Sequence, residues 1–410
     1  FFFKQKTAYE IVDCDWSSDV CSSDLTHEVG HTLGLRHNMG SSSKTPVEKL
    51  RDKEWLAKNG HTASIMDYAR FNYVAQPEDG IAQNELLPKV GAYDKWAIQW
   101  GYTYTGLNDE EADKKLNNKW IVENLTKNPR LWFGGEGFGA DPRAQTEDLS
   151  DNAVVASEYG IKNLKRILTD LPSWTKEEAD TYQNLSDMYL QLLSQFNRYM
   201  GHVTKNIGGV NETFKSIEES GDVYTPTPVA MQKAAMNFLQ TQLFATPKWL
   251  LDNNILNKIT NPTSNERIQN IQTNTLKSLL DKGRLLRLTT SYTRFKNASY
   301  SLHDMMEDTR KGLFSELTNQ KATDVFRRNL QKTYVTQLGD LINPAAANTS
   351  APSPFRAAPV DVENTDVISE AKAQLKKLAS SLKASTNADA ATQNHYEDLQ
   401  DRIKKILDPK

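Results

Sequence analysis

The distribution of apolar residues predicts a mainly helical chain. After about residue 105, apolar side chains recur every three or four positions, which is the spacing of one face of an α-helix. One long segment follows residue 175 and carries its apolar side chains at Leu185, Met188, Leu192, Phe196 and Tyr199. Further amphipathic stretches lie near residues 265–282, 301–317 and 323–342. We interpret their apolar stripes as the core of a helical domain. A surface for a membrane or a partner helix is the alternative.

Local signals mark where some of these elements begin. Thr175 and Glu178 have the spacing of a capping box, which predicts a helix start at Thr175. Thr227-Pro228 and Thr246-Pro247 each predict an N-cap followed by proline at the first helical position. The polar stretch 219–222 contains glycine and predicts the turn of a short β-hairpin.

The composition changes near the C-terminus. The stretch INPAAANTSAPSPFRAAPV is rich in alanine, proline and serine, which predicts a linker over residues 342–362. Beyond it, residues 365–384 and 390–407 predict a charged helical hairpin. The side chains expected to pack across this hairpin are Leu375, Leu378, Leu382, Leu399, Ile403 and Leu407.

The first 25 residues, FFFKQKTAYEIVDCDWSSDVCSSDL, show neither a helical period nor the alternation of a strand. They also lack the parts of a signal peptide. Back-translation of KQKTAYEI and DWSSDVCSSDL gives strings that resemble short-read sequencing adapters in their usual order. We therefore expect residues 1–25 to be adapter-derived, the natural sequence to begin near Thr26, and its upstream part to be missing. A disordered natural N-terminus is the alternative.

This interpretation changes the charge balance and the cysteine count. The whole chain has 49 basic and 52 acidic residues, of which two and five lie in residues 1–25, so 47 of each remain. A neutral chain gives no reason to expect binding to nucleic acid. Cys14 and Cys21 both lie in the excluded segment, so a disulfide framework or a cysteine-ligated metal is not expected. The mean hydropathy is −0.63 and no apolar run has the length of a membrane span.

The densest chemical signal is the sequence HEVGHTLGLRH. On a helix, His27 and His31 are four residues apart and project from one face toward a common ion. Glu28 is placed to reach a metal-bound water. We expect Gly34 to end the helix in a left-handed turn, so that the chain doubles back and delivers His37 as third ligand. Three neutral imidazoles with an open fourth position are the pattern of a catalytic zinc site.

A chance grouping of histidines on a solvent-facing helix is the alternative to this zinc site. Only 7 of the 410 residues are histidine, and three of them lie within this one motif, which favours the metal site. We expect the isolated His202, His303 and His395 to be structural or surface residues.

The stretch SIMDY, residues 64–68, follows the histidines. A HExxHxxGxxH motif followed by a tight turn with methionine resembles the metzincin clan of zinc endopeptidases. The resemblance implies that Met66 forms an apolar floor beneath the three histidines, with ordinary core packing as the alternative. It also implies a role for Tyr68, because in some metzincins a tyrosine at this place approaches the zinc and helps to stabilise the developing oxyanion.

A gluzincin arrangement is the competing ligand set, because there the third ligand is a glutamate on a later helix. Glu54 stands at a suitable distance along the chain. Its neighbours Arg51, Asp52 and Lys53 indicate a solvated helix face, and His37 completes a ligand set without it. We therefore expect His37 to be the third ligand and keep Glu54 as the alternative.

The acidic, glycine-rich stretch GGEGFGADPRAQTEDLSD has carboxylates for a calcium site but lacks the spacing of a known calcium loop. The candidate calcium ligands are Asp141, Glu147, Asp148 and Asp151. A solvated or salt-bridged loop is the interpretation that we favour.

Three further stretches resemble a family of large bacterial zinc-dependent metalloproteases with a met-zincin domain. They are YDKWAIQWGY, DPRAQTEDLSDN and FNRYMGHVTKNIGG. The resemblance covers most of residues 26–410. It implies an exported peptidase that is periplasmic, outer-membrane-attached or extracellular, acts on polypeptides, and carries its signal and further domains upstream.

We predict a mainly α fold, which would be α+β in the complete parent. Residues 26–105 are expected to form the C-terminal part of a metzincin-like catalytic domain, and residues 106–341 a mostly helical domain. The linker at 342–362 and the hairpin tail at 363–410 would follow.

The expected function is zinc-dependent peptide-bond hydrolysis without a covalent intermediate. Zinc would lower the pKa of its water and polarise the scissile carbonyl, while Glu28 would pass the proton of that water to the leaving amine. A helical binding module with a vestigial zinc site is the alternative, and the intact Glu28 argues against it.

We also expect the zinc helix to begin near residues 22–24, capped by Ser22, Ser23 or Asp24, and to end near Leu33 or Gly34. Residues before it should pack poorly, and the missing upstream sheet should leave apolar surface exposed. Incomplete support behind metal ligands typically costs about 10- to 100-fold in affinity or activity. The chain as printed is therefore expected to be poorly active, and its complete parent to be an active peptidase.

Overall fold

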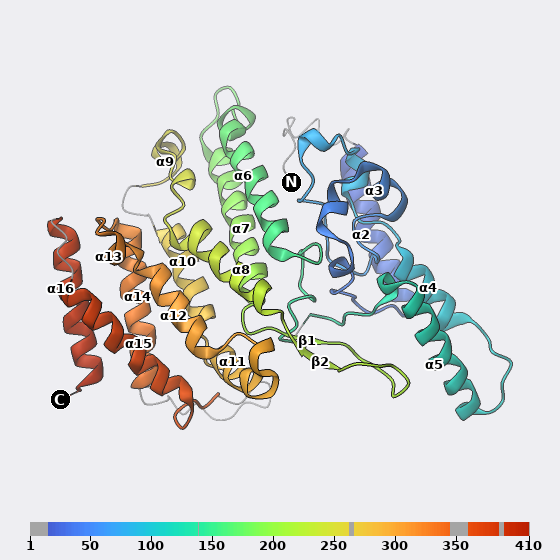
Figure 1. The fold of residues 1–410 in the computed structure, drawn as a ribbon. Helices are drawn as coiled ribbons and strands as arrows, with labels where there is room; N and C mark the ends of the chain where they lie inside the picture. The colour runs from blue at the N-terminus through green and yellow to red at the C-terminus, as the bar shows by residue number, and fades with distance from the viewer. Residues whose placement is uncertain (1–14, 138, 262–265, 345–359, 385–388, 410) are drawn as a thin grey trace, which may run out of the picture. The chain divides into compact units, whose positions relative to one another are not determined.

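The computed structural model describes residues 15–137, 139–261, 266–344, 360–384 and 389–409. Within these ranges the fold is mainly helical, as predicted, with one two-stranded sheet (Figure 1). The chain divides into two compact units, Phe1–Lys205 with Val210–Thr225, and Asn206–Gly209 with Pro226–Lys410. The domain boundaries predicted at 105, 341 and 362 do not coincide with this division and stay predictions.

The first unit combines long helices with extended loops. Its α-helices are α2 (Asp15–Thr32), α3 (Lys53–Asn59), α4 (Ala92–Tyr102), α5 (Glu110–Lys127), α6 (Ala153–Trp174) and α7 (Gln183–Lys205). Its short 3-10 helices are η1 (Ser42–Lys44), η2 (Val47–Arg51), η3 (Pro77–Asp79), η4 (Gln83–Leu86) and η5 (Pro129–Leu131).

Helix α2 begins earlier than predicted. It starts at Asp15, so Ser22, Ser23 and Asp24 lie inside the helix and do not cap it. The hydroxyl of Thr26 donates to the carbonyl of Ser22, and that of Ser23 donates to Pro88. No glycine or proline stands between residues 15 and 25. Once the downstream turns exist, each added residue gains a backbone hydrogen bond without a new nucleation cost.

Helices α6 and α7 form a closely packed pair. Gly160 allows their close approach, because a β-carbon at this position would lie 2.5 Å from the ring of Tyr199. The predicted capping box at Thr175 is wrong, since Thr175 is the C-cap of α6 and its amide and hydroxyl both donate to Leu171. The next helix begins eight residues later, at Gln183.

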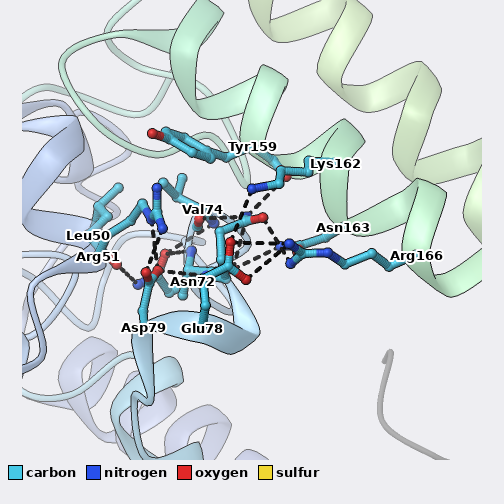
Figure 2. Close-up of polar contacts among 12 residues, drawn as sticks. Leu50, Arg51, Asn72, Val74, Glu78, Asp79, Tyr159, Lys162, Asn163 and Arg166 are labelled. Carbon is cyan, nitrogen blue, oxygen red and sulfur yellow. Dashed lines mark hydrogen bonds and ion pairs between the residues drawn. The ribbon is translucent and has the colours of Figure 1, made fainter.

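Ion pairs and hydrogen bonds join the segment after residue 70 to η2 and α6 (Figure 2). Arg51 pairs with Asp79 at 2.6 Å. Glu78 pairs with Arg166 at 3.0 Å. The side-chain amide of Asn163 donates to backbone carbonyls of the same segment, at 2.8 Å for the nearer one. These contacts fix the chain that leaves the 64–68 turn.

The predicted β-hairpin is present. Strand β1 (Val210–Glu212) pairs with β2 (Tyr224–Pro226), and the stretch 219–222 lies in the connection between them. Arg143 anchors β1 by donating to the carbonyl of Glu212 at 2.9 Å.

The second unit is built almost entirely of helices. They are α8 (Val229–Leu239), the π-helix η6 (Gln240–Phe244), η7 (Lys248–Leu250), α9 (Asn253–Ile259), α10 (Glu266–Leu279), α11 (Lys282–Phe295), η8 (Lys296–Ala298), α12 (Leu302–Leu313), α13 (Ser315–Asn319), α14 (Val325–Ile342), α15 (Asp366–Lys383) and α16 (Ala390–Leu407). The amphipathic stretches predicted from the sequence correspond to α10, α12 with α13, and α14.

Two predicted helix caps in this unit are wrong. Pro228, not Thr227, is the N-cap residue of α8, and it supplies no side-chain hydrogen bond. Only the short η7 follows Thr246, whose hydroxyl donates to Asp324 at 2.8 Å instead of to a helix terminus. Each Thr-Pro pair therefore lies close to the start of a helix. The hydrogen-bond partner of the Thr246 hydroxyl, however, is set by a tertiary contact.

The predicted C-terminal hairpin is confirmed as α15 and α16. Leu375, Leu378, Leu382, Leu399 and Ile403 are buried, and Leu407 is half-buried. Both helices also pack on α14, so they belong to the second unit. Among the helices of the described ranges, none combines the length and the apolar character that a membrane span requires. Most of the predicted linker, residues 345–359, lies outside the described residues.

Candidate metal centre

Helix α2 ends in a left-handed turn at Gly34, as predicted. Gly34 has a φ of +85°, a left-handed conformation that a side chain would disfavour. The amide of Gly34 donates to His31 at 2.9 Å, and the amide of Leu35 donates to Gly30 at 3.0 Å. These two bonds form a Schellman motif, which satisfies carbonyls at the helix end and reverses the chain. The reversal returns His37 to the helix.

The three predicted histidine ligands converge. One ligand nitrogen from each of His27, His31 and His37 lies within 4.8 Å of the other two. The Nε2 atoms of His31 and His37 are 3.1 Å apart. His27 is buried, while the other two are half-buried, so the group lies at the edge of the protein.

Backbone carbonyls set the tautomers of two of these rings. Nδ1 of His27 lies 2.8 Å from the carbonyl of Ile65, and Nδ1 of His31 lies 2.9 Å from that of Leu35. A carbonyl only accepts, so both Nδ1 atoms carry the proton and both Nε2 atoms present a lone pair. Nε2 of His27 is buried and has no hydrogen-bond partner among the residues that the structure describes. Burial, together with the neighbouring His31 and His27, lowers the pKa of His37 and favours its neutral form.

This arrangement fits a zinc ion. Tetrahedral zinc with nitrogen ligands at about 2.0–2.1 Å places two ligand nitrogens about 3.3 Å apart. The separation between His31 and His37 is close to that value. When the neutral ring of His37 carries its proton on Nδ1, the Nε2 lone pairs of His31 and His37 face each other, and one cation between them binds both. A histidine that donates its other ring nitrogen to a carbonyl is also the usual form of a metal ligand.

The turn at residues 64–68 lies against α2. Met66 is fully buried, and a β-carbon added to Gly30 would lie 2.4 Å from its sulfur. Gly30 is therefore required for this approach of the helix to the turn. The carbonyl of Ile65, one residue before Met66, accepts the bond from His27. The turn thus contacts both the backbone of α2 and one of its histidines.

Asp94 holds this turn in place, a role that no local sequence pattern indicates. Its carboxylate accepts from the hydroxyl of Ser64 at 2.6 Å, the amide of Ile65 at 2.8 Å and the amide of Gly91 at 2.7 Å. Asp94 is 3% exposed, and burial raises its pKa. The residue lies in the first turn of α4, within a stretch quoted above only for its family resemblance.

Asn38 connects the returning chain to two other segments. Its amide donates to the carbonyl of Met66 at 3.0 Å, its side chain donates to Trp132 at 3.0 Å, and its side-chain oxygen accepts from Gly134 at 2.8 Å. The residue is fully buried. It therefore fixes the position of the neighbouring His37, a role with no local sequence signal.

Tyr68 packs its ring on two of the histidines. Its ring centroid lies 4.8 Å from that of His27, with an angle of 19° between the planes, and 4.9 Å from that of His37. The side chain is half-buried. The tyrosine therefore borders the nitrogen cluster that was predicted to bind the metal.

The two glutamates considered for this site are both exposed. Glu28 lies on α2 directly after His27, with its side chain open to solvent. Glu54 lies on α3 and does not belong to the close group of ionisable ligands, which within the described residues consists of the three histidines. The geometry therefore favours His37 over Glu54 as third ligand.

The comparisons with known proteins agree with this geometry. A protein family described as Met-zincin matches residues 24–321, which is more than half of the chain. The chain belongs to the Met-zincin family. No curated protein and no solved structure matches it. Membership supports a zinc metallopeptidase of the metzincin clan and, with it, polypeptide substrates.

The carboxylates that were considered for calcium, and for which a salt-bridged loop was favoured, are engaged with protein groups in the Met-zincin chain. Asp141 pairs with Arg143 at 2.7 Å, and Glu147 pairs with Arg70 at 2.9 Å and also with Arg198. The carboxylate of Asp151 accepts from the amide of Val47 at 3.0 Å, and Asp148 is buried apart from these pairs. The salt-bridged loop is the arrangement that the structure shows.

The remaining histidines of the Met-zincin chain are structural or surface residues. His202 contacts the carbonyl of Thr146 at 2.9 Å, His303 pairs with Glu370 at 3.0 Å, and His395 contacts Gln331 at 2.8 Å. His61 is fully buried, and within the described part of the chain neither of its ring nitrogens has a hydrogen-bond partner. Burial lowers its pKa to about 3, so the ring is neutral.

Proposed function

We propose that this Met-zincin protein is a zinc-dependent endopeptidase in which Glu28 is the proton acceptor. The observation that carries the proposal is the convergence of three imidazoles, two of which are held by backbone carbonyls with their Nε2 lone pairs available. His27, His31 and His37 would hold the ion. When bound, zinc supplies Lewis acidity, which activates water and polarises a carbonyl.

Each of the nearby side chains has a distinct task in this proposal. Glu28 follows His27 on α2, and its exposed carboxylate takes a proton from the attacking water and returns it to the leaving amine. Tyr68 packs its ring against those of His27 and His37, and its hydroxyl donates to the developing oxyanion. Met66 supplies the apolar floor below the histidines. The substrates are polypeptides, and export from a bacterial cell is part of the proposal.

Zinc content and hydrolysis of casein test the proposal with a matched pair of variants. Glu28→Gln keeps the shape of the side chain but removes the proton acceptor. It should leave zinc bound and lower hydrolysis by about 100- to 10,000-fold. Glu54→Gln is the control, because it makes the same change on the exposed face of α3. This control should change neither zinc content nor hydrolysis.

The assay uses the natural gene product that contains residues 26–410, beside the chain as printed. Wild-type turnover by Glu28→Gln would remove Glu28 from the mechanism. Loss of zinc from Glu54→Gln would replace the three-histidine site with the gluzincin arrangement.

A further inference from the structure

Two arginines share one buried glutamate next to the 64–68 turn. Glu147 is 7% exposed, and its two carboxylate oxygens pair with different guanidinium groups. Oε1 lies 2.9 Å from Nε of Arg70, and Oε2 pairs with Nη1 of Arg198. Burial and the charge of Arg70 both lower the pKa of Arg198, as expected for two cations that lie close together. One negative charge thus faces two positive charges, and the three groups together carry a net positive charge.

This group of charges borders the histidine site. The amide of Glu147 donates to the carbonyl of Tyr68 at 2.9 Å, and the ring of Tyr68 packs on those of His27 and His37. Arg70 follows Tyr68 by two residues, so their α-carbons are at most about 7 Å apart. The unbalanced positive charge therefore lies at the rim of the site, on the side of Tyr68.

Of the two arginines, Arg70 is the one that is open to a ligand. Its side chain is 62% exposed, whereas that of Arg198 is 38% exposed. Arg70 pairs with Glu147 through Nε, and its terminal amino groups form no hydrogen bond with a residue that the structure describes. These two amino groups form the edge of a guanidinium that binds both oxygens of a carboxylate. Arg70 therefore presents a free carboxylate-binding edge.

The backbone at this ion pair has an unusual conformation. Arg70 has a φ of +49° and Glu147 has a φ of +63°, a left-handed region that residues other than glycine rarely adopt. Residues in such conformations cluster at sites that bind ligands, and surrounding contacts hold them there. Here the hydrogen bond from Glu147 to Tyr68 and the ion pair with Arg70 supply those contacts.

Arg36, the arginine next to His37, differs from Arg70. Its Nε and Nη2 atoms both donate to Glu136, at 3.3 and 3.0 Å. The charge of Arg36 is therefore balanced by a carboxylate of its own, and one edge of its guanidinium is occupied. Arg70 carries a charge that is not balanced in this way.

We propose that Arg70 binds a carboxylate of the polypeptide substrate and gives the histidine site a preference for acidic peptides. Arg198 alone balances the charge of Glu147, so that carboxylate does not require Arg70 as well. With its Nε held by Glu147, Arg70 keeps its outer edge oriented for binding both oxygens of a carboxylate. The carboxylate belongs either to an acidic side chain or to the C-terminus of the peptide. This inference rests on the proposed peptidase function, because it places the substrate at the histidine site.

Peptide binding to the zinc-loaded Glu28→Gln variant of the natural gene product tests Arg70 without hydrolysis. Fluorescence anisotropy compares three labelled peptides of one length. The first is neutral, with glutamines and an amidated C-terminus; the second has glutamates in place of the glutamines; the third is the neutral peptide with a free C-terminus. One of the two acidic peptides should bind about 5- to 10-fold more tightly than the neutral one. This difference should shrink at high salt, because the contact is exposed.

Substitutions in the same Glu28→Gln background assign the preference to Arg70. Arg70→Gln should abolish it, and Arg70→Lys should keep part of it, because an ammonium retains the charge but not the two-pronged geometry. Glu147 keeps its pair with Arg198 in both variants, so both should fold, which thermal melting checks. Arg166→Gln is the control, since it removes a guanidinium that pairs with Glu78 on α6. This control should leave the preference unchanged.

The outcomes separate this inference from the peptidase function. Equal binding of the three peptides, or the same preference in Arg70→Gln as in its parent, would overturn the role of Arg70. Loss of the preference in Arg36→Gln but not in Arg70→Gln would also overturn it. A chain with intact Glu28 that prefers acidic peptides through Arg70 but hydrolyses none would retain this site and refute the peptidase. If both hold, Arg70→Gln should raise KM for the preferred peptide and change kcat little.

Discussion

The two sides of the histidine site are built in opposite ways. Helix α2 supplies two of the three imidazoles and is open to solvent along its outer face, where Leu25 and Val29 are 66% and 46% exposed; Leu33, directly after the helix, is 43% exposed. The 64–68 turn supplies no imidazole, yet four of its five residues are buried and its backbone and side chains are bonded to four other parts of the chain: α2, Asn38, α4 and Glu147. The positions of the imidazoles on α2 therefore follow from local helix geometry. The 64–68 turn is instead held rigid by residues far away in the chain.

This difference determines what a mutation does at each side. A change on the exposed face of α2 removes few contacts. A change at the turn reaches the histidines through Ile65, which accepts from His27, and through Met66, which touches Gly30. Substitutions of the residues that support the turn should therefore lower stability and zinc affinity, although these residues do not contact the metal site.

Asp94→Ala should have the largest effect of the substitutions that spare the histidines. The change leaves the buried hydroxyl of Ser64 and the amides of Ile65 and Gly91 without their acceptor. Each lost partner costs about 1–3 kcal/mol, and zinc affinity should fall about 10- to 100-fold. Competition with a zinc-binding dye and thermal melting give the two readouts. Glu111→Ala, on the exposed face of α5, is the control, and equal zinc affinity in both variants would contradict the role of Asp94.

Gly30→Ala should have an intermediate effect. The new methyl group would collide with the sulfur of Met66 at 2.4 Å, and overpacking of this kind costs about 1–3 kcal/mol. Thermal melting should show the loss, and the double variant Gly30→Ala with Met66→Ala should lose less stability than the sum of the two single variants. Gly34→Ala is the comparison, because it meets no atom within 4 Å but has a φ of +85°. Its cost should be smaller, about 1 kcal/mol. Additive losses in the double variant would show that helix and turn are not in contact.

His61→Leu should have the smallest effect at neutral pH and a growing one in acid. The pKa of His61 is lowered from 6.5 to about 3 by burial. Between these values the unfolded chain binds a proton that the folded chain does not, so wild-type stability falls as the pH drops below about 6.5. The leucine variant lacks this loss. Urea unfolding at pH 7 and at pH 4.5 should show similar stability at pH 7 and a smaller decrease for the variant in acid. Parallel pH profiles would mean that His61 is accessible to protons in the folded state.

The parts of the site that follow from helix geometry were predictable. The four-residue spacing of His27 and His31 and the left-handed conformation of Gly34 could be inferred from one short sequence, because both depend on local backbone geometry. In the second unit, the regular leucine spacing of α15 and α16 likewise predicted the hairpin. These features involve neighbours in sequence.

The support of the site was not predictable, because it comes from contacts across long stretches of chain. Asp94 lies thirty residues after Ser64, and Asn38 binds a segment near Trp132. Neither residue type is unusual at its own position. The predictions of helix starts at Thr175 and Thr246 were wrong for the same reason. Thr175 ends helix α6, and the hydroxyl of Thr246 donates to Asp324.

X-ray absorption spectroscopy of the zinc-loaded protein identifies the atoms bound to the metal. We expect one zinc ion per chain with three imidazole nitrogens at about 2.0–2.1 Å and one further light atom. The His31→Ala variant should lose this spectrum, while Glu54→Gln should retain it. Zinc that is absent from folded protein, or a spectrum with fewer than three imidazoles, would contradict the claim that His27, His31 and His37 form the metal centre.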